Sequence, residues 1–156
     1  MEINRMTDPD IIIYEREDGG CSYLIPGRGY SLECVREKNV PKGARKVAFI
    51  NHKDLPLRTF RNAWEVNGES VDIDMPKARE IQIARIREAR DNHPDWPKID
   101  ADRNRAVESG DKVLMKAVRE KAQKLRDLPM VIKPNLQRAK TPHALSGIWP
   151  TILPMP

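Results

Sequence analysis

Apolar residues alternate with polar ones before about residue 74 and recur at helical spacing after it. Near the N-terminus, the β-branched and aromatic run at 11–14 is followed by the turn sequence Asp-Gly-Gly at 18–20 and by an alternating run at 21–25. Two short runs joined by such a turn are typical of a β-hairpin. The sequence therefore predicts a hairpin over residues 10–26.

One helix and three further strands are predicted between residues 31 and 73. Ser31 can cap a short helix over 32–38, and a strand follows at 46–50. The turn Asn67-Gly68 predicts paired strands at 59–66 and 69–73. Residues 1–73 are thus expected to form a small α+β domain, a mixed sheet with one covering helix. Its core is expected to contain Phe60, Ala63, Trp64 and Val66.

The region 74–129 is predicted to be helical. Asp74 and Pro76 form a helix start signal, and the apolar spacing predicts helices at 76–92, 99–109 and 112–127. Pro94 and Pro97 are expected to interrupt the helical conformation between the first two helices. We expect Ile99, Ala106 and Val107 to face inward, and the first and third helices to pack as an antiparallel hairpin.

Residues 130–156 combine five prolines with many apolar side chains. The prolines are expected to prevent a long helix, apart from a short one capped by Thr141 and running through Ser146. The remainder is predicted to be an extended, apolar, proline-rich C-terminal arm. Such an arm can pack over its own domain or along a neighbouring subunit, and we favour the neighbour.

Nine apolar residues are candidates for partner binding. Two of them fall outside the main apolar face of the first helix, one lies in the helix break at 93–97, and six lie in the predicted arm. They are Ile83, Ala84, Trp96, Leu136, Leu145, Ile148, Trp149, Ile152 and Leu153.

The composition points toward binding partners. Of the 156 residues, 33% are charged and only 5% aromatic, which is a lean supply for a self-contained core, so we expect stabilisation by another subunit. The net charge of +5 comes from interleaved acidic and basic residues, which favours a solvated surface over nucleic-acid binding. No apolar run approaches the roughly 20 residues of a membrane span, and residues 1–5 lack a signal-peptide core, so a cytosolic protein is expected.

The sequence shows no recognisable catalytic or metal-binding set, and no cofactor is predicted. Cys21 and Cys34 are expected to be reduced and largely buried thiols, a reading favoured over a disulfide bridge between them. His52 is expected to be a surface residue without an acid or nucleophile close in sequence. Asp100 and Asp102 lack the other ligands that a metal site would need. An enzyme is therefore not expected.

An ordered series of segments resembles a family of small proteins of tailed bacteriophages and prophages, encoded among tail and tail-fibre genes. The segments are NVP at 39–41 with DLPLRTFRNAW at 54–64, VDIDMPKAREI at 71–81, RAVESGD at 105–111 with LRDLP at 125–129, and TPHAL at 141–145 with IWP at 148–150. The resemblance implies a role in building the virion, with no catalytic residues. The resemblance is interrupted at 93–99, where two prolines and Trp96 stand in place of the run of leucine and alanine that the family pattern implies between the helices.

Several functions are compatible with these features. The first is a structural virion protein, an adaptor at the tail, neck or fibre attachment that forms homo- or hetero-oligomers with other virion proteins and resides in the virion and, during assembly, in the host cytoplasm. A tail or fibre assembly chaperone and a capsid decoration protein share the same sequence features. A nucleic-acid-binding module is the alternative from another class, and it predicts binding that falls steeply with salt.

Overall fold

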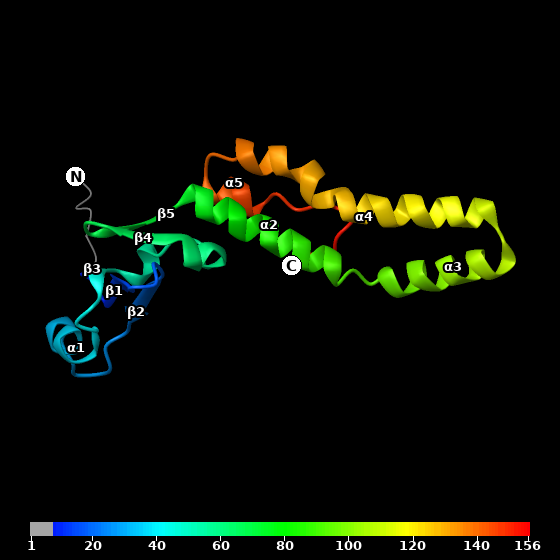
Figure 1. The fold of residues 1–156 in the computed structure, drawn as a ribbon. Coiled ribbons are helices and arrows are strands. Elements are labelled where there is room, and N and C mark those ends of the chain that lie inside the picture. Colours follow the sequence, from blue (N-terminus) through cyan, green and yellow to red (C-terminus); the bar gives the residue numbers. More distant parts are fainter. Residues whose placement is uncertain (1–7) are drawn as a thin grey trace. The chain divides into compact units, whose positions relative to one another are not determined.

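The structure, a computed structural model, describes residues 8–156 and divides the chain into two units, residues 1–78 and 79–156 (Figure 1). The first is called the sheet unit and the second the helical unit. The predicted segments 74–129 and 130–156 therefore do not form separate units, since nearly all of both belongs to the helical unit. The coarse α+β class is confirmed, because the chain contains two small antiparallel sheets together with helices.

The sheet unit contains both predicted hairpins. Strands β1 (Ile11–Glu15), β2 (Cys21–Leu24) and β3 (Arg45–Ile50) form an antiparallel sheet in the order β2-β1-β3. Strands β4 (Trp64–Asn67) and β5 (Ser70–Ile73) form a separate two-stranded sheet. Gly19 and Gly68 adopt positive φ angles of 85° and 63° in the hairpin turns, a conformation that glycine adopts without steric cost.

The two sheets share one apolar core. Its cluster combines residues of both sheets, including Ile13 of β1, Ala48 of β3 and Trp64 of β4. Helix α1 (Leu32–Asn39) begins at Ser31, whose side chain accepts a hydrogen bond from the Cys34 amide at 3.2 Å. The helix has no fully buried residue, so the core depends on the strands.

The predicted strand over 59–66 is wrong in its first half. A short 3₁₀ turn, η1 (His52–Asp54), is followed by a second 3₁₀ segment, η2 (Arg58–Ala63), and only then by β4. Phe60 and Ala63 are both fully buried. Because they are three residues apart, they share one side of a 3₁₀ turn but would point to opposite faces of a strand.

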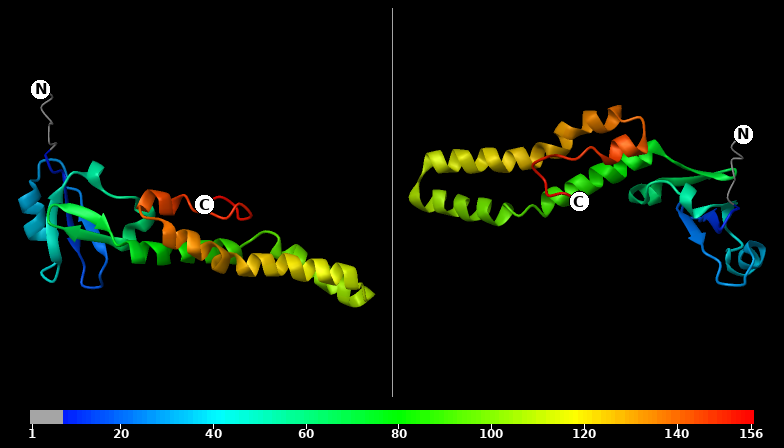
Figure 2. Two further views of the ribbon diagram at one scale, coloured as in Figure 1. Left: turned by 90° about the horizontal axis from the view of Figure 1, so that it is seen from above. Right: turned by 180° about the vertical axis from the view of Figure 1, so that it is seen from behind.

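The helical unit consists of α2 from Arg79 onward, α3, α4 and α5. Helices α2 (Met75–Asp91) and α3 (Trp96–Ser109) follow one another, and α4 (Lys112–Arg138) runs back along them before the short α5 (Pro142–Ser146) (Figures 1 and 2). The expected hairpin of the first and third helices is incorrect for the first half of α4. Its partner there is α3, through a cluster of Ile99, Val118, Ala122 and Leu125.

The turn between α3 and α4 carries the predicted end and start signals. Gly110 ends α3 in the left-handed conformation, with φ at 65°. Asp111 then caps α4 by accepting a hydrogen bond from the Leu114 amide at 2.9 Å. The turn is short, so α3 and α4 lie side by side and antiparallel.

The predicted extended arm is wrong over its first nine residues, which belong to α4. The helix continues through Pro129 and Pro134, and its ribbon bends in this region (Figure 1). Each proline removes one internal hydrogen bond. Burial of Pro129 and Leu136 in the helical unit compensates for that loss, since tertiary packing can override local propensity.

Candidate interaction surfaces

Residues 139–156, called the C-terminal segment, are held against α2 by side chains that donate to backbone carbonyls. Arg79 donates from Nη2 to the carbonyl oxygen of Ala139 at 2.9 Å. Gln82, which is fully buried, donates from Nε2 to the carbonyl oxygen of Ile148 at 2.9 Å. These bonds satisfy carbonyls that lie outside regular helix, where a buried carbonyl without a partner would be costly.

His93 forms a further contact with the C-terminal segment. Its side chain is buried, with Nδ1 3.1 Å from the amide nitrogen of Asp95 and Nε2 3.0 Å from the carbonyl oxygen of Ile152. Because the Asp95 amide can only donate and the carbonyl can only accept, both bonds require a neutral ring with its proton on Nε2. No local sequence signal predicts this role, since the bonded carbonyl is 59 residues away.

The six candidates of the predicted arm differ in exposure. Leu136, Leu145 and Leu153 are buried, whereas Ile148 and Trp149 are half-buried and Ile152 is exposed. The Arg85 guanidinium lies over the Trp149 ring, 5.6 Å from its centre. Most of this apolar surface is therefore covered within the helical unit itself.

The three candidates on the helices also differ. Ile83 is buried, Ala84 is exposed, and Trp96 is half-buried. Trp96 packs against the α3–α4 cluster and donates from Nε1 to the carbonyl oxygen of Arg90 at 2.6 Å. The structure thus does not bring these three together at one site, and partner binding at all nine candidates stays a prediction.

A groove of about 570 Å³, called the α3–α4 groove, lies at the connected ends of α3 and α4. Its apolar lining comes from Ala106, Val107 and Met115. Its charged lining on α4 comes from Lys112, Lys116, Arg119 and Glu120, and the turn residues Gly110 and Asp111 complete it.

The sequence pattern predicts Val107 in the core, but this residue is 66% exposed. Ala106 and Ile99 are seven residues apart, so they share the buried face of α3, and Val107 lies about 100° away from it. The sequence feature that could have predicted the groove is therefore an apolar residue outside the buried face of α3, combined with basic residues at helical spacing on α4.

The positive charge belongs to the helical unit. Residues 79–156 contain 16 Lys and Arg against 10 Asp and Glu, a net charge of +6, whereas residues 1–78 contain 12 against 13, a net charge of −1. Taken over the whole chain, these charges had indicated an evenly mixed surface. Resolved by unit, they indicate a basic helical unit.

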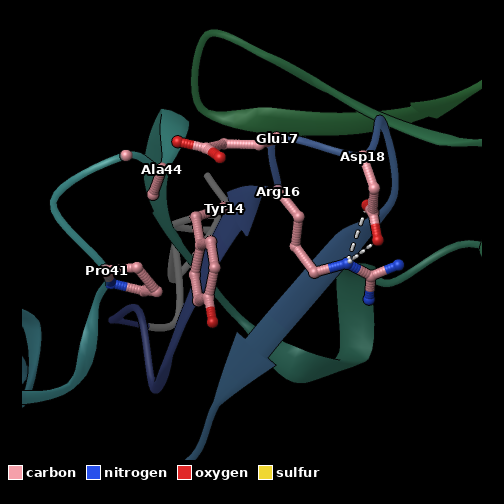
Figure 3. A pocket seen from close by; sticks show the side chains of 7 residues that line it. Tyr14, Arg16, Glu17, Asp18, Pro41 and Ala44 are labelled. Carbon is pink, nitrogen blue, oxygen red and sulfur yellow. Dashed lines mark hydrogen bonds and ion pairs between the residues drawn. The ribbon is translucent and has the colours of Figure 1, made fainter.

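A pocket of about 400 Å³ lies in the sheet unit, beside the turn that joins β1 and β2 (Figure 3). Tyr14 forms part of its wall, and the Arg16 side chain turns to Asp18, with Nε 2.9 and 3.2 Å from the two carboxylate oxygens. Asp18 also accepts from the Gly20 amide at 3.0 Å, and these contacts, the amide first, lower the pKa of Asp18. The charges of this turn therefore stabilise the turn itself.

His52 has an acidic neighbour that the sequence did not predict. The Asp10 carboxylate accepts a hydrogen bond from the His52 amide at 2.7 Å, and it also contacts Nδ1 of the ring. The ring contact is the largest cause lowering the pKa of Asp10. Among residues 8–156 no nucleophile is hydrogen-bonded to the other ring nitrogen, so the pair ties η1 to the start of β1.

The two thiols occupy different surroundings. Cys21 is buried, with Sγ 3.1 Å from the carbonyl oxygen of Trp64, and burial raises the pKa of its thiol. Cys34 is half-exposed on α1, and both cysteines are free.

Two further findings concern residues 8–156 as a whole. No cluster of three or more His, Cys, Asp or Glu side chains in this range is placed to hold a metal ion. None of the helices there is both long enough and apolar enough to cross a lipid bilayer.

Comparison with known proteins gives no match, whether with protein-family models, curated proteins or solved structures. The resemblance to bacteriophage proteins therefore stays a prediction from the sequence segments.

Proposed function

We propose that this chain is a non-enzymatic structural protein of a tailed bacteriophage virion, an adaptor that binds other virion proteins at the tail, neck or fibre attachment. The observation that carries the binding role is a set of large apolar side chains left in water by the helical unit. They are Val107, Val113, Met130, Val131, Ile152 and Met155, with exposures from 45% to 84%. The phage context rests on the ordered segments of the sequence.

Met130 and Val131 illustrate the argument. They are 74% and 69% exposed on α4, so the core of the helical unit does not need them. A valine on an exposed helix position is also a weaker helix former than the polar residues usually found there. Burying one such side chain against a partner is worth about 1.5–3 kcal/mol, which supports a binding role.

Mass spectrometry of purified particles tests the proposal. A tagged full-length chain is expressed in cells producing a phage that encodes it, and we expect it in the particles after density-gradient purification. If it is absent from particles but bound to a fibre protein in the lysate, the adaptor role is overturned in favour of an assembly chaperone. A double variant, Met130→Ser with Val131→Ser, is expected to reduce incorporation, whereas the control Lys140→Ser is not.

Nucleic-acid binding is a second candidate, favoured by the net charge of +6 on the helical unit. It predicts retention of DNA at about 50 mM salt with a steep loss as salt rises. Unmeasurable binding at that salt concentration would eliminate it.

A further inference from the structure

We propose that the α3–α4 groove is the docking site for an amphipathic helix of a partner protein, with acidic residues along one side of an apolar stripe. The proposal deepens the adaptor function by assigning it a surface and a partner chemistry, and it rests on that function for its biological context. It does not involve the nine candidates predicted from the sequence.

The groove offers apolar contacts that its own helices leave unused. Val107 is 66% exposed and Met115 is half-buried, while Ala106, which also lines the groove, is buried. Val107 projects outside the stripe that packs α3 on α4, so the hairpin does not require a valine at this position. Methionine adapts its shape to different partners, and it is common on surfaces that accept apolar helices.

The basic wall of the groove has a regular spacing. Lys112, Lys116 and Arg119 lie on one face of α4, at positions separated by four and three residues. At 1.5 Å per residue the three cations span about 10 Å, which is two helical turns. Acidic residues spaced by three or four positions on an incoming helix would match them.

These three cations are available for a partner. Within residues 8–156, none of them forms an ion pair or a side-chain hydrogen bond. The Asp111 carboxylate, by contrast, already caps α4 through the Leu114 amide. Asp111 and Glu120 are the two carboxylates of the lining and both oppose an acidic helix, but only Glu120 can be replaced without removing a helix cap, so it provides the probe.

The combination of surfaces favours a protein helix over nucleic acid. A phosphate backbone would use the cations but would gain little from Val107 and Met115. A helix lying between two antiparallel helices would use both, because its apolar stripe packs into the groove and its flank faces the basic wall. Charge complementarity therefore selects an acidic flank.

The test uses the full-length chain and two synthetic helical peptides of about 20 residues. Both carry leucine at every third or fourth position, and their flanks carry glutamate in one peptide and lysine in the other. Fluorescence anisotropy at about 50 mM salt is expected to show at least tenfold tighter binding of the glutamate peptide. A single-stranded DNA of about the same length provides the nucleic-acid arm.

Four variants locate the binding. Lys116→Glu is expected to weaken binding of the glutamate peptide by about 5–20-fold, Val107→Asp by at least tenfold, and Glu120→Lys is expected to strengthen it by about 2–5-fold. Lys133→Glu, outside the groove, is the control and should leave the affinity within twofold. Circular dichroism checks that each variant keeps its helical content.

Three results would overturn the proposal. The first is equal affinity of the chain for the two peptides. The second is a loss of affinity for the glutamate peptide in Lys116→Glu without any loss in Val107→Asp. The third is DNA binding whose affinity changes across the variants in the same way as that of the glutamate peptide. Mass spectrometry of purified particles distinguishes failure of the groove proposal from failure of the adaptor proposal. Incorporation of a variant that no longer binds the peptide would refute the groove as the docking site and leave the adaptor function standing, whereas absence of the unaltered chain from particles would refute the function alone.

Discussion

Replacement of Gln82 tests how the helical unit holds its C-terminal segment. Gln82 is fully buried on α2, and both ends of its amide are used. Its Nε2 donates to the carbonyl oxygen of Ile148 at 2.9 Å, and its Oε1 accepts from Nη1 of Arg85 at 2.9 Å. Gln82→Leu keeps a similar volume but removes both hydrogen bonds.

The expected cost follows from the groups left behind. The Ile148 carbonyl loses its donor where the surroundings are partly buried, and a buried group without a partner costs about 1–3 kcal/mol. The Arg85 guanidinium is half-buried and can turn to water, so it adds less. Gln82→Glu keeps the acceptor for Arg85 but places a carboxylate against the carbonyl. Its destabilisation is therefore expected to be larger at neutral pH and to shrink in acid, as the carboxyl becomes protonated.

Hydrogen exchange and thermal unfolding measure these effects. For a unit of this size a loss of 1 kcal/mol lowers Tm by about 4–8 °C. Amides of residues 142–156 should lose protection in Gln82→Leu, while those of the sheet unit should not. The control is Gln123→Leu, because Gln123 makes a hydrogen bond of 2.7 Å to Asp127 at an exposed site, where a loss below about 0.5 kcal/mol is expected. Equal effects of the two substitutions would refute the assigned role of Gln82.

Three further predictions concern other described contacts. His93→Gln should preserve the attachment of the C-terminal segment, since a glutamine amide can donate and accept in the same way, whereas His93→Ala should speed its limited proteolysis. The pKa of Asp10 is lowered by His52, so its stabilising effect exists above the ordinary value near 3.8 and is lost as pH falls through the lowered pKa of the folded state; Asp10→Asn should remove this part of the acid sensitivity, measured by amide protection in β1 and β3. A thiol reagent at about pH 8 should label Cys34 in the folded protein and Cys21 only after unfolding, because Cys21 is buried and the pKa of its thiol is raised.

The features predicted correctly from the sequence are those that nearby residues determine. The turn at Asn67-Gly68 produced the β4–β5 hairpin, and Ser31 and Thr141 cap the two short helices as expected. Each of these signals acts within about four residues of the element that it defines. Their contribution therefore changes little when the rest of the chain folds.

The sequence-based prediction that the prolines end the helix is wrong because their effect depends on distant residues. Pro129 and Pro134 disfavour a helix locally, yet α4 continues to Arg138. Arg79, more than 50 residues away, donates to the carbonyl oxygens of Leu136 and Ala139 at 3.2 and 2.9 Å, at the end where the helix lacks partners of its own. A reading of local propensity could not include this contact. The same limit explains why the Asp10–His52 pair was missed.

The division of apolar residues between core and surface changes where a partner should be sought. The apolar C-terminus had suggested that Leu136, Leu145 and Leu153 bind another subunit, but the helical unit buries all three itself. The apolar residues that remain in water include Val107, beside the basic wall of the α3–α4 groove. A side chain that is already buried gains no hydrophobic free energy when a partner binds, so a partner is expected at apolar surface that is still exposed to water. That reasoning adds the α3–α4 hairpin to the surfaces where a partner is expected, and it disfavours the buried leucines of the C-terminal segment. Substitutions at Val107 should therefore affect binding more than substitutions at Leu145 that preserve folding.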